Sequence, residues 1–231
     1  MSIVNNQLIT KSWSSVTAEN ISDVWDFFED AFTGFDGVTF LRNTESTEMY
    51  VYLDPDKKMK IKISLVDNTS GIHVEYYLKA EKCSYEYSQA SNVTARAEYI
   101  RTSYGVAWVI KTATSTISIN DVTCFFTLVS TPTLILDAIT TLGGSTKSHY
   151  VLSAIHDSIE SIAENQSYIS NILGGQKFWV TNACSLVKDL RLRHMFRVIG
   201  IPSNSYPLGN IRVNGRNIIW FGRFALEFEE E

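Results

Sequence analysis

Residues 49–78 read MYVYLDPDKKMKIKISLVDNTSGIHVEYYL, and this stretch decides the fold class. Apolar and polar residues alternate over 49–53, over 59–65 and again over 72–78, which is the period of a strand with one buried face. The segments between these runs are rich in Asp, Asn, Pro and Gly, which favour turns. The stretch therefore predicts a three-stranded antiparallel meander.

An amphipathic helix is predicted before this meander, at about residues 18–32. Apolar residues recur there at intervals of three or four, Thr17 or Asn20 is suited to cap the start, and Gly34 follows as a stop signal. The apolar stripe favours a helix that packs on a sheet. The other face is acidic, whereas a helix on a membrane surface would carry Lys and Arg.

Strand character continues in the rest of the chain. Runs of β-branched and aromatic residues predict strands at 106–110, 116–119, 123–129, 133–136, 177–180 and 190–199. Residues 80–103 are polar and poorly periodic, and three interpretations stay open for them: a weak strand, a short helix or a long surface loop. Residues 150–172 favour a strand followed by a loop or a short helix.

The C-terminal part carries the clearest turn signal. Asn214-Gly215 lies between apolar runs over 211–220, and this dipeptide favours the two-residue turn of a β-hairpin. Alternation over 224–228 predicts a last strand. The sequence thus predicts an α+β fold dominated by β structure, with antiparallel sheets in a sandwich or a meander, an N-terminal amphipathic helix and a C-terminal hairpin.

Two domain organisations are compatible with this pattern. A helix and meander region, 1–80, can be followed by a β-rich region, 81–231, or the whole chain can form one single domain, 1–231.

A net charge of −5 does not indicate a nucleic-acid binder, although a local contact with nucleic acid stays open. The N-terminus lacks the basic and apolar regions of a signal peptide, so we expect a chain made in the cytoplasm, without membrane contact.

No pattern in the sequence predicts a catalytic or metal site. Residues 143–148 resemble a phosphate-binding loop, but glycine is missing before Lys147 and at the first position of that motif. The histidines are scattered and the three cysteines form no close pair. We therefore expect no enzyme, no cofactor and no metal. A pocket that joined His156 or His194 to an acid and a hydroxyl would change this expectation.

The two ends of the chain carry opposite charge. Residues 1–41 hold one Lys and six acidic residues, whereas residues 184–226 hold seven Lys or Arg and one acidic residue. Neutralisation within the fold, for example by the acidic tail 227–231, is one interpretation, docking of one subunit on another is the second, and a DNA-facing stripe is the third. The candidate interface comprises Asp23, Asp26, Glu29 and Asp30 of the helix and Arg191, Arg193, Arg197, Arg212 and Arg216 near the C-terminus.

The segment 209–226, GNIRVNGRNIIWFGRFAL, combines a short strand, a glycine-bearing turn and an aromatic strand that ends in Ala-Leu. Together with the helix, the Ser/Thr-rich strands and the missing catalytic motif, it resembles virion proteins of tailed bacteriophages. The resemblance covers the last quarter of the chain closely. It implies a structural subunit of the virion, in the tail, neck, baseplate or head-associated part. Such a subunit is made in the host cytoplasm, forms a homo-oligomeric ring or shell and also binds other virion proteins.

A binding module is the alternative to a purely structural subunit. Such a β module, in a tail fibre or at a cell surface, would bind carbohydrate or a receptor through exposed aromatic side chains. Candidates from the sequence are Tyr85, Tyr87, Tyr104 and Trp179.

Overall fold

The computed structural model of the chain describes most of its N-terminal half and the strands of its C-terminal half. The described residues are 7–66, 70–89, 94–112, 122–127, 132–139, 147–161, 163–170, 177–182, 192–199, 208–213, 216–221 and 224–228. Some strand residues are described by their backbone alone, among them all residues of 163–170, 177–182 and 192–199.

Helix α1 (Ile21–Phe32) confirms the predicted amphipathic helix. All the apolar residues of its predicted stripe are buried, and Gly34 has the positive φ that ends a helix readily. The helix starts three residues later than predicted, because Thr17 forms a β-bridge with Ser70 and its carbonyl closes a turn onto Asn20 and Ile21. Among the described residues, no helix is long and apolar enough to cross a membrane.

A five-stranded antiparallel sheet confirms the predicted meander and extends it at both ends. Its order follows the chain. The strands are β2 (Thr39–Asn43), β3 (Glu48–Tyr52), β4 (Met59–Val66), β5 (Ser70–Leu78) and β6 (Glu81–Gln89). In the turn between β3 and β4, the Asp54 carboxylate accepts hydrogen bonds from the backbone N–H groups of Lys58 and Met59, so this acid stabilises the turn.

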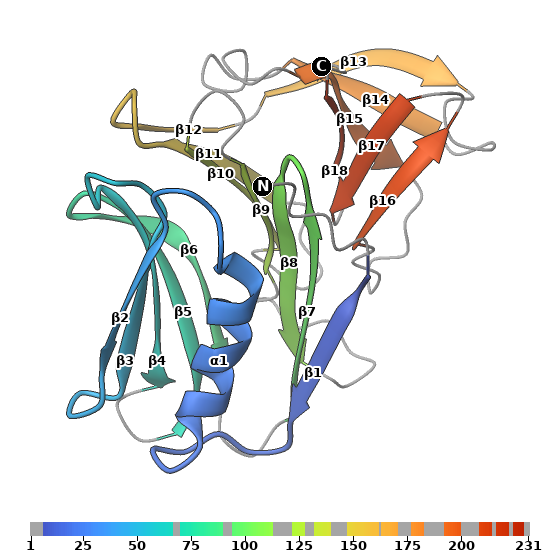
Figure 1. Cartoon of the computed structure of the whole chain (residues 1–231). Coiled ribbons are helices and arrows are strands. Elements are labelled where there is room, and N and C mark those ends of the chain that lie inside the picture. The colour runs from blue at the N-terminus through green and yellow to red at the C-terminus, as the bar shows by residue number, and fades with distance from the viewer. Residues whose placement is uncertain are drawn as a thin grey trace.

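A seven-stranded antiparallel sheet faces the first one. Its order is β1-β7-β8-β9-β10-β11-β12, so an N-terminal strand pairs at the edge of a second meander. The strands are β1 (Ile9–Trp13), β7 (Ala95–Thr102), β8 (Gly105–Thr112), β9 (Val122–Thr127), β10 (Thr133–Ile139), β11 (Lys147–Ser153) and β12 (Ser158–Ser161). Helix α1 lies along the space between the two sheets (Figure 1), and its aromatic side chains pack on both.

The seven-stranded sheet is buried on both of its faces around β8. Val106, Trp108 and Ile110 belong to the core under α1, while Ala107 and Val109 point to the opposite face and are also buried. On that opposite face, strands of the third sheet contact β7, β8 and β9. Burial on both sides explains why residues 106–110 are apolar without alternation.

The third sheet confirms the C-terminal hairpin. It has six antiparallel strands in the order β13-β14-β15-β18-β17-β16. The strands are β13 (Ala163–Ser170), β14 (Lys177–Asn182), β15 (Leu192–Ile199), β16 (Leu208–Val213), β17 (Arg216–Phe221) and β18 (Phe224–Phe228). Strands β16 and β17 pair with each other, and the turn Asn214-Gly215 between them lies outside the described residues.

Two ambiguous segments are strands. Residues 80–103 provide β6 and β7, so the loop and helix interpretations were wrong there. In the part of 150–172 that is described, the loop or short helix expected after the first strand was also wrong, because β12 and β13 follow β11. The cause is pairing with neighbouring strands, which imposes β structure on segments whose own pattern is weak. The predicted strand at 116–119 lies outside the described residues.

Candidate functional site

The face of the five-stranded sheet that points away from the core carries polar and aromatic side chains from adjacent strands. Alternation along β3, β4 and β5 places apolar side chains inward and polar or aromatic ones outward. We call this surface the outer face. Its residues from these three strands are Glu48, Tyr50, Tyr52, Lys60, Lys62, Ser64, His73, Glu75 and Tyr77.

The strand register arranges the outer face in rows that run across the sheet. Tyr52 lies opposite Lys60, and Lys60 lies opposite Tyr77. In the neighbouring row, Tyr50 lies opposite Lys62, which in turn lies opposite Glu75. Directly opposed side chains in antiparallel strands lie close enough to interact, so aromatic and charged groups alternate in contact with one another.

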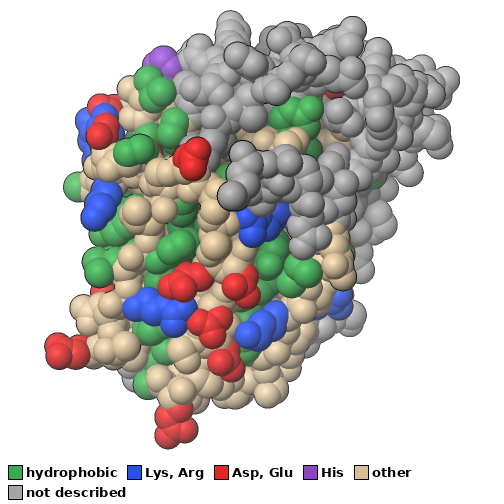
Figure 2. Space-filling view, in the orientation of Figure 1, with side chains coloured by type: hydrophobic (Ala, Val, Ile, Leu, Met, Phe, Trp, Pro, Cys, Tyr) green, Lys and Arg blue, Asp and Glu red, His purple; other side chains and the backbone are tan. Residues whose placement is uncertain are grey.

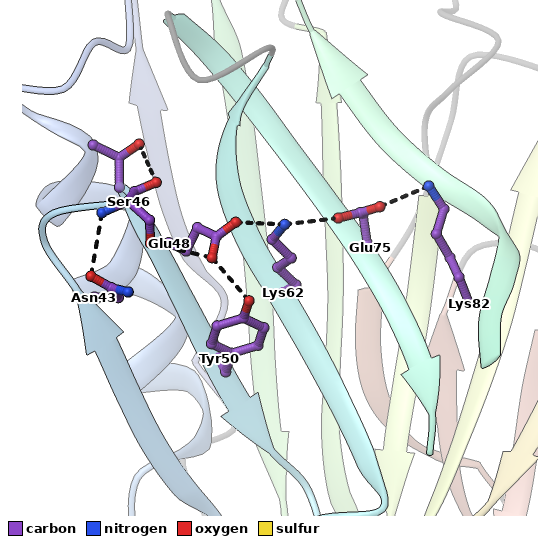
Figure 3. Close-up of polar contacts among 8 residues, drawn as sticks. Asn43, Ser46, Glu48, Tyr50, Lys62, Glu75 and Lys82 are labelled. Atoms are coloured by element: carbon purple, nitrogen blue, oxygen red, sulfur yellow. Dashed lines mark hydrogen bonds and ion pairs between the residues drawn. The ribbon is translucent and has the colours of Figure 1, made fainter. Parts of the chain in front are cut away.

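An ion-pair ladder crosses four strands of this face (Figure 3). Lys62 Nζ lies 2.6 Å from Glu48 Oε1 and 3.6 Å from Glu75 Oε2, and Lys82 Nζ lies 2.7 Å from Glu75 Oε1. The Tyr50 hydroxyl donates to Glu48 Oε2 at 2.9 Å. The Glu75 side chain is 7% exposed, so this ladder is more than a loose surface pairing, and it fixes the positions of the side chains around it.

The ladder shifts the pKa values of its members. Burial favours the neutral carboxyl of Glu75, but the hydrogen bond from Lys82 and the nearby cations outweigh it and lower the pKa. The pKa of Glu48 is lowered in the same way, against burial, by Lys62 and Tyr50. Burial works against charge on Lys62, yet Glu48 and Glu75 raise its pKa. Glu48, Lys62 and Glu75 are therefore charged at neutral pH.

Next to the ladder lies a group of aromatic rings and lysines that we call the tyrosine row: Tyr50, Tyr52, Tyr77, Lys57 and Lys60. The rings of Tyr50 and Tyr52 are nearly parallel, with centroids 6.2 Å apart. Lys60 Nζ lies 5.2 Å from the centroids of both Tyr50 and Tyr77, and Lys57 Nζ lies 5.2 Å from that of Tyr52. Cation–π attraction therefore holds both ammonium groups against the rings.

The two lysines of the tyrosine row differ from their neighbours in their partners. Among the described residues, no carboxylate lies within ion-pair distance of Lys57 or Lys60. By contrast, Lys58 and Lys79 bind Asp157 at 3.6 Å and 2.8 Å, and these two ion pairs tie the five-stranded sheet to the turn between β11 and β12. The tyrosine row thus carries positive charge that the described part of the chain does not neutralise.

The acidic face of α1, predicted as one half of an interface, binds cations of its own chain. Arg42 of β2 lies 2.6 Å from Asp26 and 2.6 Å from Glu29, and its guanidinium lies 5.8 Å from the ring centroid of Trp25. Asp23 and Asp30 are exposed. In Figure 2, acidic and basic side chains lie next to each other over α1. This favours neutralisation within the fold for two of the four acids.

Two further cations bind backbone carbonyls of α1. Arg101 of β7 donates to the carbonyls of Asp30 and Thr33, at the end of the helix where carbonyl groups lack helical partners, and it also lies over the Phe35 ring. Lys11 of β1 donates to the Asp23 carbonyl. Arg101 and Lys11 belong to the seven-stranded sheet and Arg42 to the five-stranded one, so basic residues from both sheets anchor the helix.

The basic half of the predicted interface is described by backbone alone. Strand β15 carries Arg193 and Arg197, β16 carries Arg212 and β17 carries Arg216, all within one sheet. Arg191 lies outside the described residues. The structure brings these four strand positions into one sheet, the six-stranded one.

The aromatic residues proposed from the sequence for ligand binding are not those of the outer face. Tyr87 was predicted to be exposed and this was wrong, because it is fully buried on the inner side of β6. Tyr104 is partly buried in the turn between β7 and β8, and the side chains of Tyr85 and Trp179 are not described. The missed signal was the alternation in 49–53 and 72–78, which already placed Tyr50, Tyr52 and Tyr77 opposite the buried positions.

The other residues considered for chemistry give no site among the described residues. Residues 143–146 lie outside them, and the side chain of His194 is not described. His156 is exposed beside Asp157, whose carboxylate binds lysines. Cys83 is buried. Within the described part of the chain, no group of His, Cys, Asp or Glu could hold a metal ion.

Comparison with known proteins gives no relative. No family model matches the chain, and neither a curated protein nor a solved structure does.

Proposed function

We propose that this chain is a non-enzymatic β module of a tailed-bacteriophage virion that binds carbohydrate through the outer face of its five-stranded sheet. The observation that carries the proposal is the tyrosine row, in which rings and lysines from adjacent strands are held in contact at the surface. Tyrosine rings bury apolar area at low conformational cost and carry a hydroxyl, which suits the mixed apolar and polar faces of a sugar. The virion assignment rests on the resemblance of residues 209–226.

The outer face suits a sugar better than a protein surface. Protein interfaces concentrate their binding energy in dehydrated pockets, whereas this face is a sheet surface crossed by charged side chains. Covering the ion-pair ladder with a protein would remove water from four charged groups, which opposes binding. A sugar chain can lie on the rings while the ladder beside it stays hydrated.

A glycan array with the purified chain tests this function. We expect the wild-type chain to bind at least one class of polysaccharide, and the double variant Tyr52→Leu, Tyr77→Leu to lose that binding at an unchanged circular dichroism spectrum. Leucine keeps the bulk and the apolar character but removes the aromatic face. Tyr104→Leu, away from the outer face, is the matched control and should bind as the wild type does. A chain that binds no glycan, or a double variant that binds normally, would refute the proposal.

Assembly within the virion is the second candidate function, and the sheet order favours it. Arginine-bearing strands β15, β17 and β16 lie in the same sheet, so positive charge is carried by one layer of the fold. Light scattering of the purified chain gives its oligomeric state. We expect the combined variant Arg191→Glu, Arg193→Glu, Arg197→Glu to dissociate an oligomer while each monomer stays folded. An oligomer that survives this charge reversal would exclude docking through these residues.

A further inference from the structure

We infer that the tyrosine row selects an acidic carbohydrate, one that bears carboxylate groups, with Lys57 and Lys60 as the residues that bind the acid. This inference rests on the proposed carbohydrate binding and specifies the ligand class of the same face. Neither lysine has a carboxylate partner among the described residues, although the other lysines of this face do. An anionic ligand would therefore complement the positive charge of Lys57 and Lys60.

The position of Lys60 makes it the central contact. It lies on β4 between Tyr52 of β3 and Tyr77 of β5, and its Nζ is 5.2 Å from the ring centroids of Tyr50 and Tyr77. An ammonium group held between two rings has lost part of its freedom before any ligand arrives. A carboxylate that binds it consequently costs less side-chain entropy than one that captures a free lysine.

The extent of the row fits a chain of sugars and not a single ion. Tyr52, Lys60 and Tyr77 occupy three adjacent strands, so the row spans two strand spacings, about 10 Å. Lys57, in the turn before β4, adds a second cation over the ring of Tyr52. Two cations that each lie against tyrosine rings match a polymer in which acid groups recur along a chain of sugar rings.

The ion-pair ladder limits which anions this face accepts. Glu48 and Glu75 are charged at neutral pH; Glu75 lies in the row next to that of Lys60, and Glu48 lies in the row after it. A densely charged polyphosphate that covered the whole face would meet these carboxylates, and like charges repel. A carboxylated sugar presents one charge per acidic ring, so it meets less of this repulsion than a polyphosphate does.

Titration calorimetry with two matched oligosaccharides tests the inference. The acidic probe is tetragalacturonate, and the neutral probe is the galactose tetramer of the same linkage. We expect the wild-type chain to bind the acidic probe at least about tenfold more tightly, and this preference to shrink as salt rises, because screening weakens a charge contact. A single-stranded oligonucleotide serves as a third probe and should bind more weakly than tetragalacturonate.

Lysine variants assign the effect to the tyrosine row. Lys57→Gln, Lys60→Gln should reduce affinity for the acidic probe about tenfold and leave the neutral probe within about twofold. Lys11→Gln is the matched control, because Lys11 also lies over an aromatic ring, Trp13, but on β1 of the other sheet. It should bind both probes as the wild type does.

The outcomes separate this inference from the proposed function. Equal binding of both tetramers, or an unaltered preference in the lysine variant, refutes the acidic ligand while carbohydrate binding stands. If the wild-type chain binds no glycan, both the acidic ligand and the proposed carbohydrate binding are refuted. Tighter binding of the oligonucleotide than of tetragalacturonate would assign the lysines to nucleic acid and overturn the inference.

Discussion

Replacing Arg42 by Met should destabilise the fold, because we expect Arg42 to neutralise two of the acidic residues of α1. Arg42 makes ion pairs of 2.6 Å with both Asp26 and Glu29 and lies over the ring of Trp25. Both acids raise the pKa of Arg42, the hydrogen bond to Glu29 most, so the contact is favourable to the charged form. Methionine keeps much of the apolar stem and removes the charge.

The size of the effect follows from the exposure of the groups. The Arg42, Asp26 and Glu29 side chains are 32%, 55% and 29% exposed, so each ion pair contributes at most about 1 kcal/mol. The contact with Trp25 adds about 0.5–1 kcal/mol, and the two acids, three residues apart on the helix, then repel each other by a few tenths of a kcal/mol. We expect a loss of about 2 kcal/mol in the free energy of unfolding.

Urea unfolding of a double-mutant cycle measures this effect. The cycle combines Arg42→Met with Asp26→Asn, and a second cycle combines it with Glu29→Gln. We expect coupling in both cycles, and a smaller loss in 1 M salt than in 0.1 M salt because the pairs are partly exposed. A loss of stability below about 0.5 kcal/mol, or no coupling, would show that these contacts do not hold the helix. All four helix acids would then again be candidates for an interface with another subunit.

Three further predictions concern the core and the ladder. Gly105 has a φ of +154°, and a Cβ there would lie 1.9 Å from the carbonyl oxygen of Phe126, so Gly105→Ala should cost about 3 kcal/mol or more in urea unfolding, and a loss below 1 kcal/mol would contradict this packing. Phe32 is fully buried and packs edge to face on Trp108, so Phe32→Ala should cost about 3–5 kcal/mol by the same measurement. The pKa of Glu75 is lower in the folded chain than in the unfolded chain. The charged carboxylate of Glu75 therefore stabilises the fold at pH values above the pKa of an unfolded Glu, and this stabilisation is lost as the pH falls through the pKa of the folded state. Glu75→Gln should therefore flatten the dependence of stability on pH below about 4.5, whereas an unchanged curve would show that the ladder does not contribute.

The sequence predicted the strands that have one buried face and missed what pairing imposes. Residues 49–78 alternate clearly, and β3, β4 and β5 lie there. Residues 81–89 are mostly polar, yet they form β6 because β5 offers an edge and Tyr87 fills the core. A weak pattern is compatible with a strand when the neighbouring strand supplies the hydrogen bonds, and a single sequence does not show which neighbour that is.

The candidate site was predictable in composition but not in arrangement. Alternation already placed Tyr50, Tyr52 and Tyr77 on the face opposite the buried residues. It could not place Lys60 between Tyr52 and Tyr77, because that contact depends on the register of three strands. Charge counting is limited in the same way, since it gave the acids of α1 without the Arg42 that binds two of them from β2.

Register therefore gives the outer face its chemical character. Had β4 paired with β3 one residue out of step, Lys60 and Lys62 would point into the core, so the buried side of the sheet holds the outer face in place. The buried residues of β4 that enforce this register, Met59, Ile61 and Ile63, lie between the two lysines and beside them along the strand. The same strand pairing thus stabilises the core and sets the geometry of the tyrosine row. Substitutions at the inner positions should alter the proposed carbohydrate binding only as far as they weaken the pairing of β4 with β3 and β5.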